Sequence, residues 1–204
     1  MSELEQFIKD SSKILSTTGQ KTGLVVNLGD NVSFIVPVYK GFVMKHAITK
    51  FDIKGQDITK YFQRLLLQEG GLSKVTWDKY VIAEIKKKLC YVALDLNKEK
   101  IQSQGKKEPF TRPDGTIIYV EESRFLAPEC LFNPSLLGKD IDPLDDTIVK
   151  TIGLCDIQSR RELFGNIILS GSALLKGLNE RLQLEIKELI PEFVEARIQN
   201  VKQN

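Results

Sequence analysis

Apolar and turn-forming positions alternate most regularly between residues 22 and 44. The apolar, largely β-branched runs lie at residues 24–26, 32–38 and 42–44. The turn at residues 29–31 consists of Gly, Asp and Asn, which tolerate positive φ. This pattern predicts a meander of three short antiparallel strands, whose first turn presents backbone N–H groups suited to binding a phosphate.

Apolar residues recur with helical spacing in several further segments. The predicted helices cover residues 2–15, 54–69, 76–89, 143–153, 157–164 and 173–189. Thr76 and Asp156 are the predicted N-caps of two of these helices, and Pro191 marks the end of the last one.

Shorter segments complete the predicted secondary structure. The Pro-Asp-Gly turn at residues 113–115 predicts a hairpin over residues 110–120, and the polar, aperiodic residues 97–107 predict a loop. Further strands are predicted at residues 90–94, 166–169 and 193–201. Strands alternate with helices through the second half of the chain, which indicates an α/β or α+β fold.

Composition narrows the class of protein. The 204 residues are 42% hydrophobic and 27% charged, as in ordinary globular proteins, and the net charge of +2 gives no steering toward nucleic acid. The three cysteines form no Cys-x-x-Cys pair, which favours free thiols in a reducing compartment over structural zinc. No apolar run is long enough to span a bilayer. We therefore expect a soluble intracellular protein without a membrane partner.

Several segments, taken in order along the chain, resemble signatures of the actin family. The meander segment resembles the family's second phosphate loop with its flanking strands, and FDIKGQDIT resembles the start of the next helix. Further similar segments are EIKKKLCYVALD, RPDGTI, RFLAPECLFNPSLLG and NIILSGSALLKGLNERL. The similarity extends from about residue 15 to residue 198 and concerns only the second half of the actin fold.

The resemblance implies an α/β fold, half of an actin-like, ribonuclease H-like ATPase, with a mixed sheet, flanking helices and an inserted, mostly helical lobe. Residues 1–53 and 140–204 correspond to the large lower lobe, and residues 54–139 to the smaller lobe inserted into it. The family's first phosphate loop and the segment that closes its lower lobe are not found in this sequence. We therefore expect a truncated actin-related protein.

In the family, the turn that corresponds to Gly29, Asp30 and Asn31 contacts the β- and γ-phosphates, and its acidic residues hold magnesium-bound water. Here Asn27 stands at the first acidic position, and Asn31 replaces the second glycine. An amide cannot replace a carboxylate as proton acceptor or as a charge partner of the metal shell. The structural alternative is a β-turn built from permissive residues.

The expected water-positioning residue is also changed. Phe34 stands where the family has a histidine near the attacking water, and a phenyl ring has no polar atom to orient water. The alternative for Phe34 is a packed strand aromatic. The one histidine, His46, matches a family position away from the phosphates, where we expect a structural role. We therefore assign no catalytic residue and expect no ATPase activity.

Lys86 matches a family lysine that binds ribose and base, but Lys87 replaces the glutamate beside it, and a lysine cannot accept from ribose hydroxyls. The structural alternative to a nucleotide contact is that the three consecutive lysines form a solvated face of the helix. Gly171 matches the adenine-side loop, which here lacks a second glycine and is one residue short. The residual candidates for nucleotide binding are Gly29, Asp30, Asn31, Lys86 and Gly171. ATP or ADP with Mg²⁺ is the cofactor to consider; none is assigned firmly, and no metal ligand is assigned.

Two segments resemble surfaces through which the family makes protein contacts. Leu136 and Leu137 lie in an apolar loop between the lobes, which touches the opposite strand of a filament, and we expect an exposed pair there. Asp156 and Ile157 resemble part of the end surface that meets the next subunit. Local packing is the alternative for both segments.

The missing half is expected to leave an apolar face on the helix around Leu178, Leu182 and Ile186, or on the sheet edge at residues 166–169. This face predicts a protein partner or self-association, with actin or actin-related subunits as candidates and no direct contact with nucleic acid. Residues 2–15 are the segment expected to cover part of it.

The function expected first is that of a cytoskeletal or scaffold protein acting through protein contacts, with nucleotide binding weak or lost. One alternative is an ATP-binding, ATP-hydrolysing filament subunit. Another is a scaffold subunit of a chromatin-remodelling or dynein-activating complex. The expected location is the cytoplasm, with the nucleus as the alternative.

Overall fold

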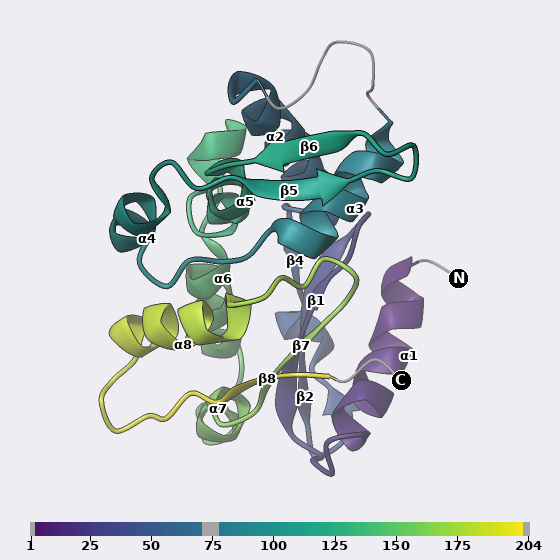
Figure 1. Ribbon diagram of the computed structural model, residues 1–204. Helices are drawn as coiled ribbons and strands as arrows, with labels where there is room; N and C mark the ends of the chain where they lie inside the picture. Colours follow the sequence, from purple (N-terminus) through teal and green to yellow (C-terminus); the bar gives the residue numbers. More distant parts are fainter. Residues whose placement is uncertain (1–2, 71–77, 202–204) are drawn as a thin grey trace.

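The computed structural model describes residues 3–70 and 78–201 (Figure 1). The larger sheet has the strand order β3-β2-β1-β7-β8, with β4 also paired to β2. Its strands are β1 (Gly23–Leu28), β2 (Ser33–Tyr39), β3 (Phe42–Val43), β4 (Thr49–Phe51), β7 (Ile167–Ser170) and β8 (Ile198–Asn200). β1 pairs antiparallel with β2 and parallel with β7, which makes the sheet mixed. The predicted meander is confirmed, and residues 45–47 after it form a 3₁₀ turn, η1 (Lys45–Ala47).

Both faces of this sheet are buried, and the period of two along each strand decides which residues face which side. On β1, Val25 faces one side, whereas Leu24 and Val26 belong to the main core on the other. β7 repeats this pattern, with Ile168 on the first side and its two neighbours on the second. Helices must therefore cover both faces.

The helices that flank the sheet are α1 (Glu3–Ser16), α6 (Leu144–Gly153), α7 (Ile157–Phe164) and α8 (Leu178–Leu189). In Figure 1, α1 lies on one side of the sheet and the other three lie on the opposite side. Leu15 of α1 is buried, and the ring of Phe7 stacks on Phe34 of β2 with 6.2 Å between centroids. α1 covers an apolar face, but not the one expected for it: this face consists mainly of residues of β1, β2 and β7, whereas Leu178, Leu182 and Ile186 belong to the core on the other side of the sheet.

The apolar face expected around Leu178, Leu182 and Ile186 is not exposed. All three side chains are at most 1% exposed, because α8 packs against α6 and against the sheet at β8. Residues 167–169 of β7 are fully buried between β1 and β8. The prediction of an open surface at these residues is therefore wrong.

The segment between β4 and α6 carries the remaining elements. These are α2 (Gly55–Gln68), α3 (Lys79–Leu89), α4 (Leu96–Ser103), β5 (Glu108–Thr111), β6 (Ile117–Val120), α5 (Ser123–Leu126), η2 (Ala127–Leu131) and η3 (Pro134–Leu137). The predicted hairpin is confirmed as β5 and β6. Thr76, the predicted cap of α3, lies outside the described residues, and Asp78 caps the helix by accepting from the Tyr80 N–H at 2.8 Å. The proposed lobe boundaries at 53/54 and 139/140 stay a prediction.

Four predicted elements differ from the structure, and one of them, the strand predicted at residues 193–201, is limited to β8. Residues 97–107 include helix α4 because the Asp95 carboxylate caps its first turn, accepting from the backbone of Asn97 and Lys98. The predicted strand at residues 90–94 contributes only one bridge, from Tyr91 to Lys176. The last helix begins at Leu178 rather than at residue 173, because the preceding residue is a glycine with φ +83°.

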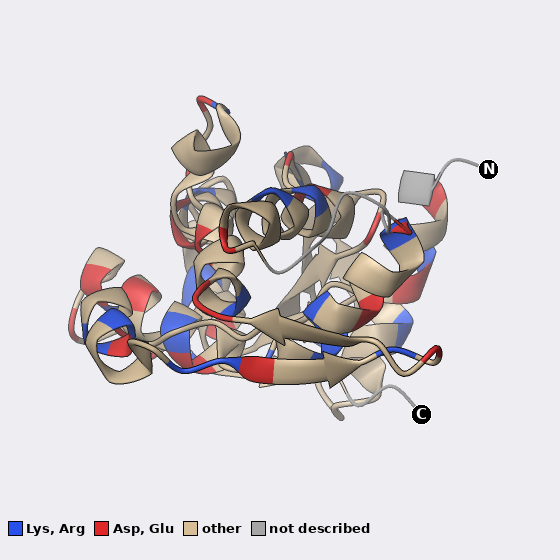
Figure 2. Cartoon of the chain, turned by 45° about the horizontal axis from the view of Figure 1, so that its top comes forward, with Lys and Arg blue, Asp and Glu red and all other residues tan. Residues whose placement is uncertain are grey.

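The charged side chains are interspersed over the elements (Figure 2).

One basic residue joins α8 to the segment inserted between β4 and α6. Arg181 donates to the Ala93 carbonyl at 2.8 Å and pairs with Glu129 at 3.3 Å. Burial raises the pKa of Glu129, while the attraction of Arg181 opposes that shift. None of the described helices is long and apolar enough to cross a membrane.

The covering role of α1 can be tested with Leu15→Ala. The Leu15 side chain is buried, so the substitution leaves a cavity between α1 and the sheet. It is expected to lower the free energy of unfolding by about 2–4 kcal/mol. Urea denaturation measures the change. Lys13→Ala, two residues away and exposed, is the control and should leave stability unchanged. Equal stability of the two variants would show that α1 does not hold the sheet face.

Candidate functional site

The turn between β1 and β2 docks onto the first turn of α2. The Gly55 N–H donates to the Gly29 carbonyl at 2.9 Å, and the Gln56 N–H donates to the Asp30 carbonyl at 3.2 Å. The Gln56 side chain donates to Asn31 Oδ1 at 2.7 Å. The N–H groups at a helix start are the donors that would otherwise be offered to an anion. Here two of them are already used by the turn.

Glycine at position 55 allows this close approach. A Cβ atom built there would clash with Asp30 Oδ1 and lie 2.8 Å from the Ala173 methyl group. The Asp30 carboxylate consequently lies against the start of α2, where the helix dipole favours a negative charge.

Lys86 reaches the same point from α3. Its ammonium donates to the Gly55 carbonyl at 3.0 Å, and the residue is only 6% exposed. Burial lowers the pKa of Lys86, and the attraction of Asp30 opposes the shift. Lys87, the next residue, is exposed and takes no part in this contact.

Gly171 and Asn27 complete the cluster on the other side of the turn. Gly171 has φ +109°, and a Cβ atom there would clash with the Leu28 carbonyl and lie 2.8 Å from Asn27 Oδ1. The Ala173 N–H donates to the same Leu28 carbonyl at 2.9 Å. The Asn27 amide thus lies between the β1–β2 turn and the loop that follows β7.

The five predicted nucleotide-binding residues therefore come together in the fold. Gly29, Asp30, Asn31 and Lys86 surround Gly55, and Gly171 lies across Leu28 from them. We call these five residues, with Gly55 and Gln56, the cradle. Gly55 and Gln56 were not among the predicted site residues; the signal for them was a glycine at the second position of the helix predicted over residues 54–69. Phe34 is 7% exposed and packs under α1.

A sequence model of the family described as Actin matches residues 7–204. The chain belongs to the actin family. The α/β architecture, with a mixed sheet flanked by helices, agrees with an actin-like fold. The roles assigned to individual residues by resemblance to actin stay predictions.

The cradle fits a magnesium–nucleotide complex of the actin kind poorly. Asp30 contributes a carboxylate, but one of its oxygens packs on Gly55, and Asn27 contributes an amide in place of a second acid. Among the residues that the structure describes, no group of three or more His, Cys, Asp or Glu is arranged to hold a metal ion. A hard cation such as Mg²⁺ needs oxygen ligands, preferably charged ones. We derive no reaction step through this group.

The two leucines expected to be exposed in this actin-family chain are half-buried. Leu136 and Leu137 pack against the main core, and the Leu136 carbonyl accepts from Arg64 of α2 at 2.9 Å. The prediction of an exposed pair is wrong, because the short η3 turn folds back onto α2. Asp156 and Ile157, in contrast, are exposed at the start of α7, and Ile157 is 80% exposed.

Ile157 borders a large apolar hollow, whose residues come from segments far apart in the sequence. The hollow has a volume of about 650 Å³ and lies between α6, α7 and the segment after α8. We call it the α7 groove; its residues are Val149, Gly153, Ile157, Arg160, Arg161, Phe164 and residues 189–191, 193 and 194. Phe193 is 84% exposed at its edge.

The close packing at Gly171 gives a stability prediction. Gly171→Ala places a methyl group against the Leu28 carbonyl at a φ that L-residues rarely adopt, and should lower the free energy of unfolding by about 2–4 kcal/mol. Gly153→Ala is the control, since its Cβ meets nothing within 4 Å and its φ is ordinary. The control should be neutral or stabilising by up to about 1 kcal/mol. If urea unfolding ranks the two variants equally, the loop does not pack as described.

Proposed function

We propose that this actin-family chain works as a cytoskeletal or scaffold protein, through contacts with another actin-family subunit, with weak nucleotide binding and no ATPase activity. The observation that carries the proposal is the α7 groove. An apolar hollow with exposed apolar side chains at its rim is a feature of surfaces through which proteins bind one another. A cytoplasmic location accords with this role, and a nuclear one is the alternative.

The groove has the composition of a protein contact surface. Ile157 and Phe193 are exposed apolar side chains at its rim, and Phe164 is buried in its wall. Arg160 is held rigidly, because it donates to the Cys155 and Gly153 carbonyls at 2.9 and 2.6 Å. Aromatic and arginine side chains held in place are typical of the residues that dominate binding at interfaces.

Weak nucleotide binding follows from how the cradle uses its polar groups. Lys86 and the first N–H groups of α2 bind protein carbonyls, so a phosphate would have to displace contacts that the fold already makes. Phosphoryl transfer depends on positioning and charge stabilisation, and Asn27 and Phe34 supply neither a carboxylate nor a water-orienting group.

The convergence of the five candidate residues is the observation that favours the alternative, an ATP-hydrolysing filament subunit. A scaffold role in a chromatin-remodelling or dynein-activating complex would use the same kind of protein contact and differs from the first proposal in the partner.

Thermal melting with nucleotide separates the proposal from the ATPase alternative. With 1 mM Mg-ATP, we expect the melting temperature to rise by less than about 2 °C, which corresponds to a Kd of about 1 mM or weaker. A site with a Kd of about 1 µM would raise it by roughly 8–16 °C. Asp30→Asn shows whether any rise comes from the cradle. A large, saturable rise with phosphate release would establish the alternative.

The groove is tested by charge insertion at Ile157. In sedimentation velocity we expect the wild type to associate with itself or with purified actin as concentration rises, and Ile157→Asp to remain monomeric. Ile101→Asp is a matched control, because Ile101 is 76% exposed on α4, outside the groove. The proposal fails if the wild type sediments as a monomer with and without actin, or if both variants behave alike.

A further inference from the structure

One buried carboxylate lies where α6 packs against α8. Asp145, in the first turn of α6, is only 9% exposed. Its Oδ1 atom is buried and has no hydrogen-bond partner within residues 3–70 and 78–201, and Asp145 forms no ion pair in this part of the chain. Buried polar atoms are normally hydrogen-bonded, so this oxygen lacks a donor.

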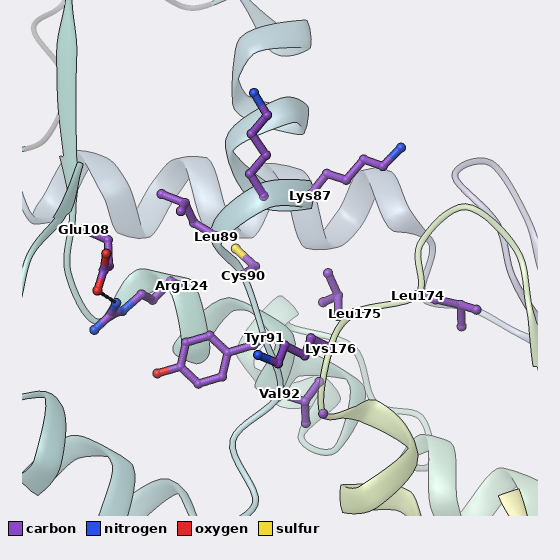
Figure 3. A pocket seen from close by; sticks show the side chains of 12 residues that line it. Lys87, Leu89, Cys90, Tyr91, Val92, Glu108, Arg124, Leu174, Leu175 and Lys176 are labelled. Atoms are coloured by element: carbon purple, nitrogen blue, oxygen red, sulfur yellow. Dashed lines mark ion pairs between the residues drawn. The ribbon is translucent and has the colours of Figure 1, made fainter. Parts of the chain in front are cut away.

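Other buried charges of this chain do have partners. Arg124 is 6% exposed and pairs with Glu108 at 3.0 Å (Figure 3). Glu129, which is also 6% exposed, pairs with Arg181 at 3.3 Å. A buried charge without a partner is costly, because little water is present to screen it. Asp145 differs from Arg124 and Glu129 in having no such partner.

The charges that act on Asp145 are negative. Burial raises the pKa of Asp145 most, and the charges of Asp146 on α6 and Glu185 on α8 raise it further. Backbone N–H groups at the start of α6 oppose the shift. Both like charges favour the neutral form of the Asp145 side chain.

A single guanidinium serves the other carboxylates at this place. Arg181 of α8 pairs with Glu185, one turn further along the helix, and with Glu129 of η2. Lys100 of α4 also attracts Glu129. We call Glu129, Asp145, Arg181 and Glu185 the α8 junction. It contains three carboxylates and one cation.

The α8 junction also connects α8 to the segment inserted between β4 and α6. Arg181 donates to the Ala93 carbonyl at 2.8 Å, and its guanidinium lies 4.7 Å from the centroid of the Phe132 ring. Because Glu185 pairs with the same guanidinium, a force on Glu185 acts on this connection.

We propose that the α8 junction binds one proton, on Asp145, and that this proton tightens the contact between α8 and the inserted segment. A neutral Asp145 gains an O–H donor and does not repel Glu185, so Glu185 stays paired with Arg181. An ionised Asp145 repels Glu185 and weakens that pair. The inference is independent of the proposed function, because it uses neither the cradle nor the α7 groove.

The pH dependence has a definite sign. The pKa of Asp145 is raised in the folded chain, which therefore holds the proton more tightly than the unfolded chain does. The stabilisation from this proton is complete below the ordinary aspartate pKa of about 4. It is lost as the pH rises through the pKa of the folded residue. Burial also raises the pKa of Glu129, so Glu129 acts in the same direction.

Carboxyl-carbon NMR titration of the full chain detects this proton directly. In the wild type, we expect Asp145 to titrate above the ordinary aspartate value of about 4. Glu185→Gln removes one like charge and should lower the pKa of Asp145. Titration of wild-type Asp145 at or below about 4 would overturn the proposal. An unchanged pKa in Glu185→Gln would overturn the role given to the α8 junction.

Hydrogen exchange of the full chain tests the effect on the contact. After correction for the intrinsic effect of pH, amides of residues 91–95 and 127–133 should exchange at least about threefold more slowly at about pH 4.5 than at about pH 7.5. Asp145→Asn cannot titrate and should remove this difference. Asp140→Asn, the control, changes an exposed aspartate outside α6 and should behave as the wild type does. The same pH dependence in the wild type and in Asp145→Asn would overturn the proposal.

Discussion

The main chain of Gly55 is the point on which the arrangement of the cradle depends. Its N–H bonds to the β1–β2 turn and its carbonyl accepts from Lys86 of α3, so three elements meet at one residue without a side chain. A larger residue would push Asp30 away from the start of α2. The same contacts that place the candidate residues together also use up their donors, and the proposed weak nucleotide binding is a consequence of that packing.

The β1–β3 meander was predictable, because residues 22–44 carry continuous apolar runs separated by turn-forming residues. Helix α4 was missed for a physical reason. It has almost no apolar stripe and depends on the Asp95 cap and on hydrogen bonds from Tyr91 and Ser103 to Glu99. Such contacts are formed by single polar atoms, and no periodicity in the sequence predicts them.

The candidate site likewise has residues that were predictable from the sequence and residues that were not. Gly29, Asp30 and Lys86 were found by resemblance, since local segments carry it. The exposure of Leu136 and Phe193 was not predictable, because it depends on which distant elements pack over each residue. Leu136, in η3, packs against the main core, whereas Phe193 lies in the segment after α8 and is exposed.

The pairing of β1 with β7 has a consequence for how the chain assembles. The Asn166 side chain, next to β7, donates to the Thr22 carbonyl, next to β1, across 144 residues of sequence. During synthesis, β1 and β2 therefore emerge long before the parallel partner of β1, and their hairpin carries an open edge in the meantime. The intervening helices can form from local contacts first, which makes closure of the larger sheet a late event in folding.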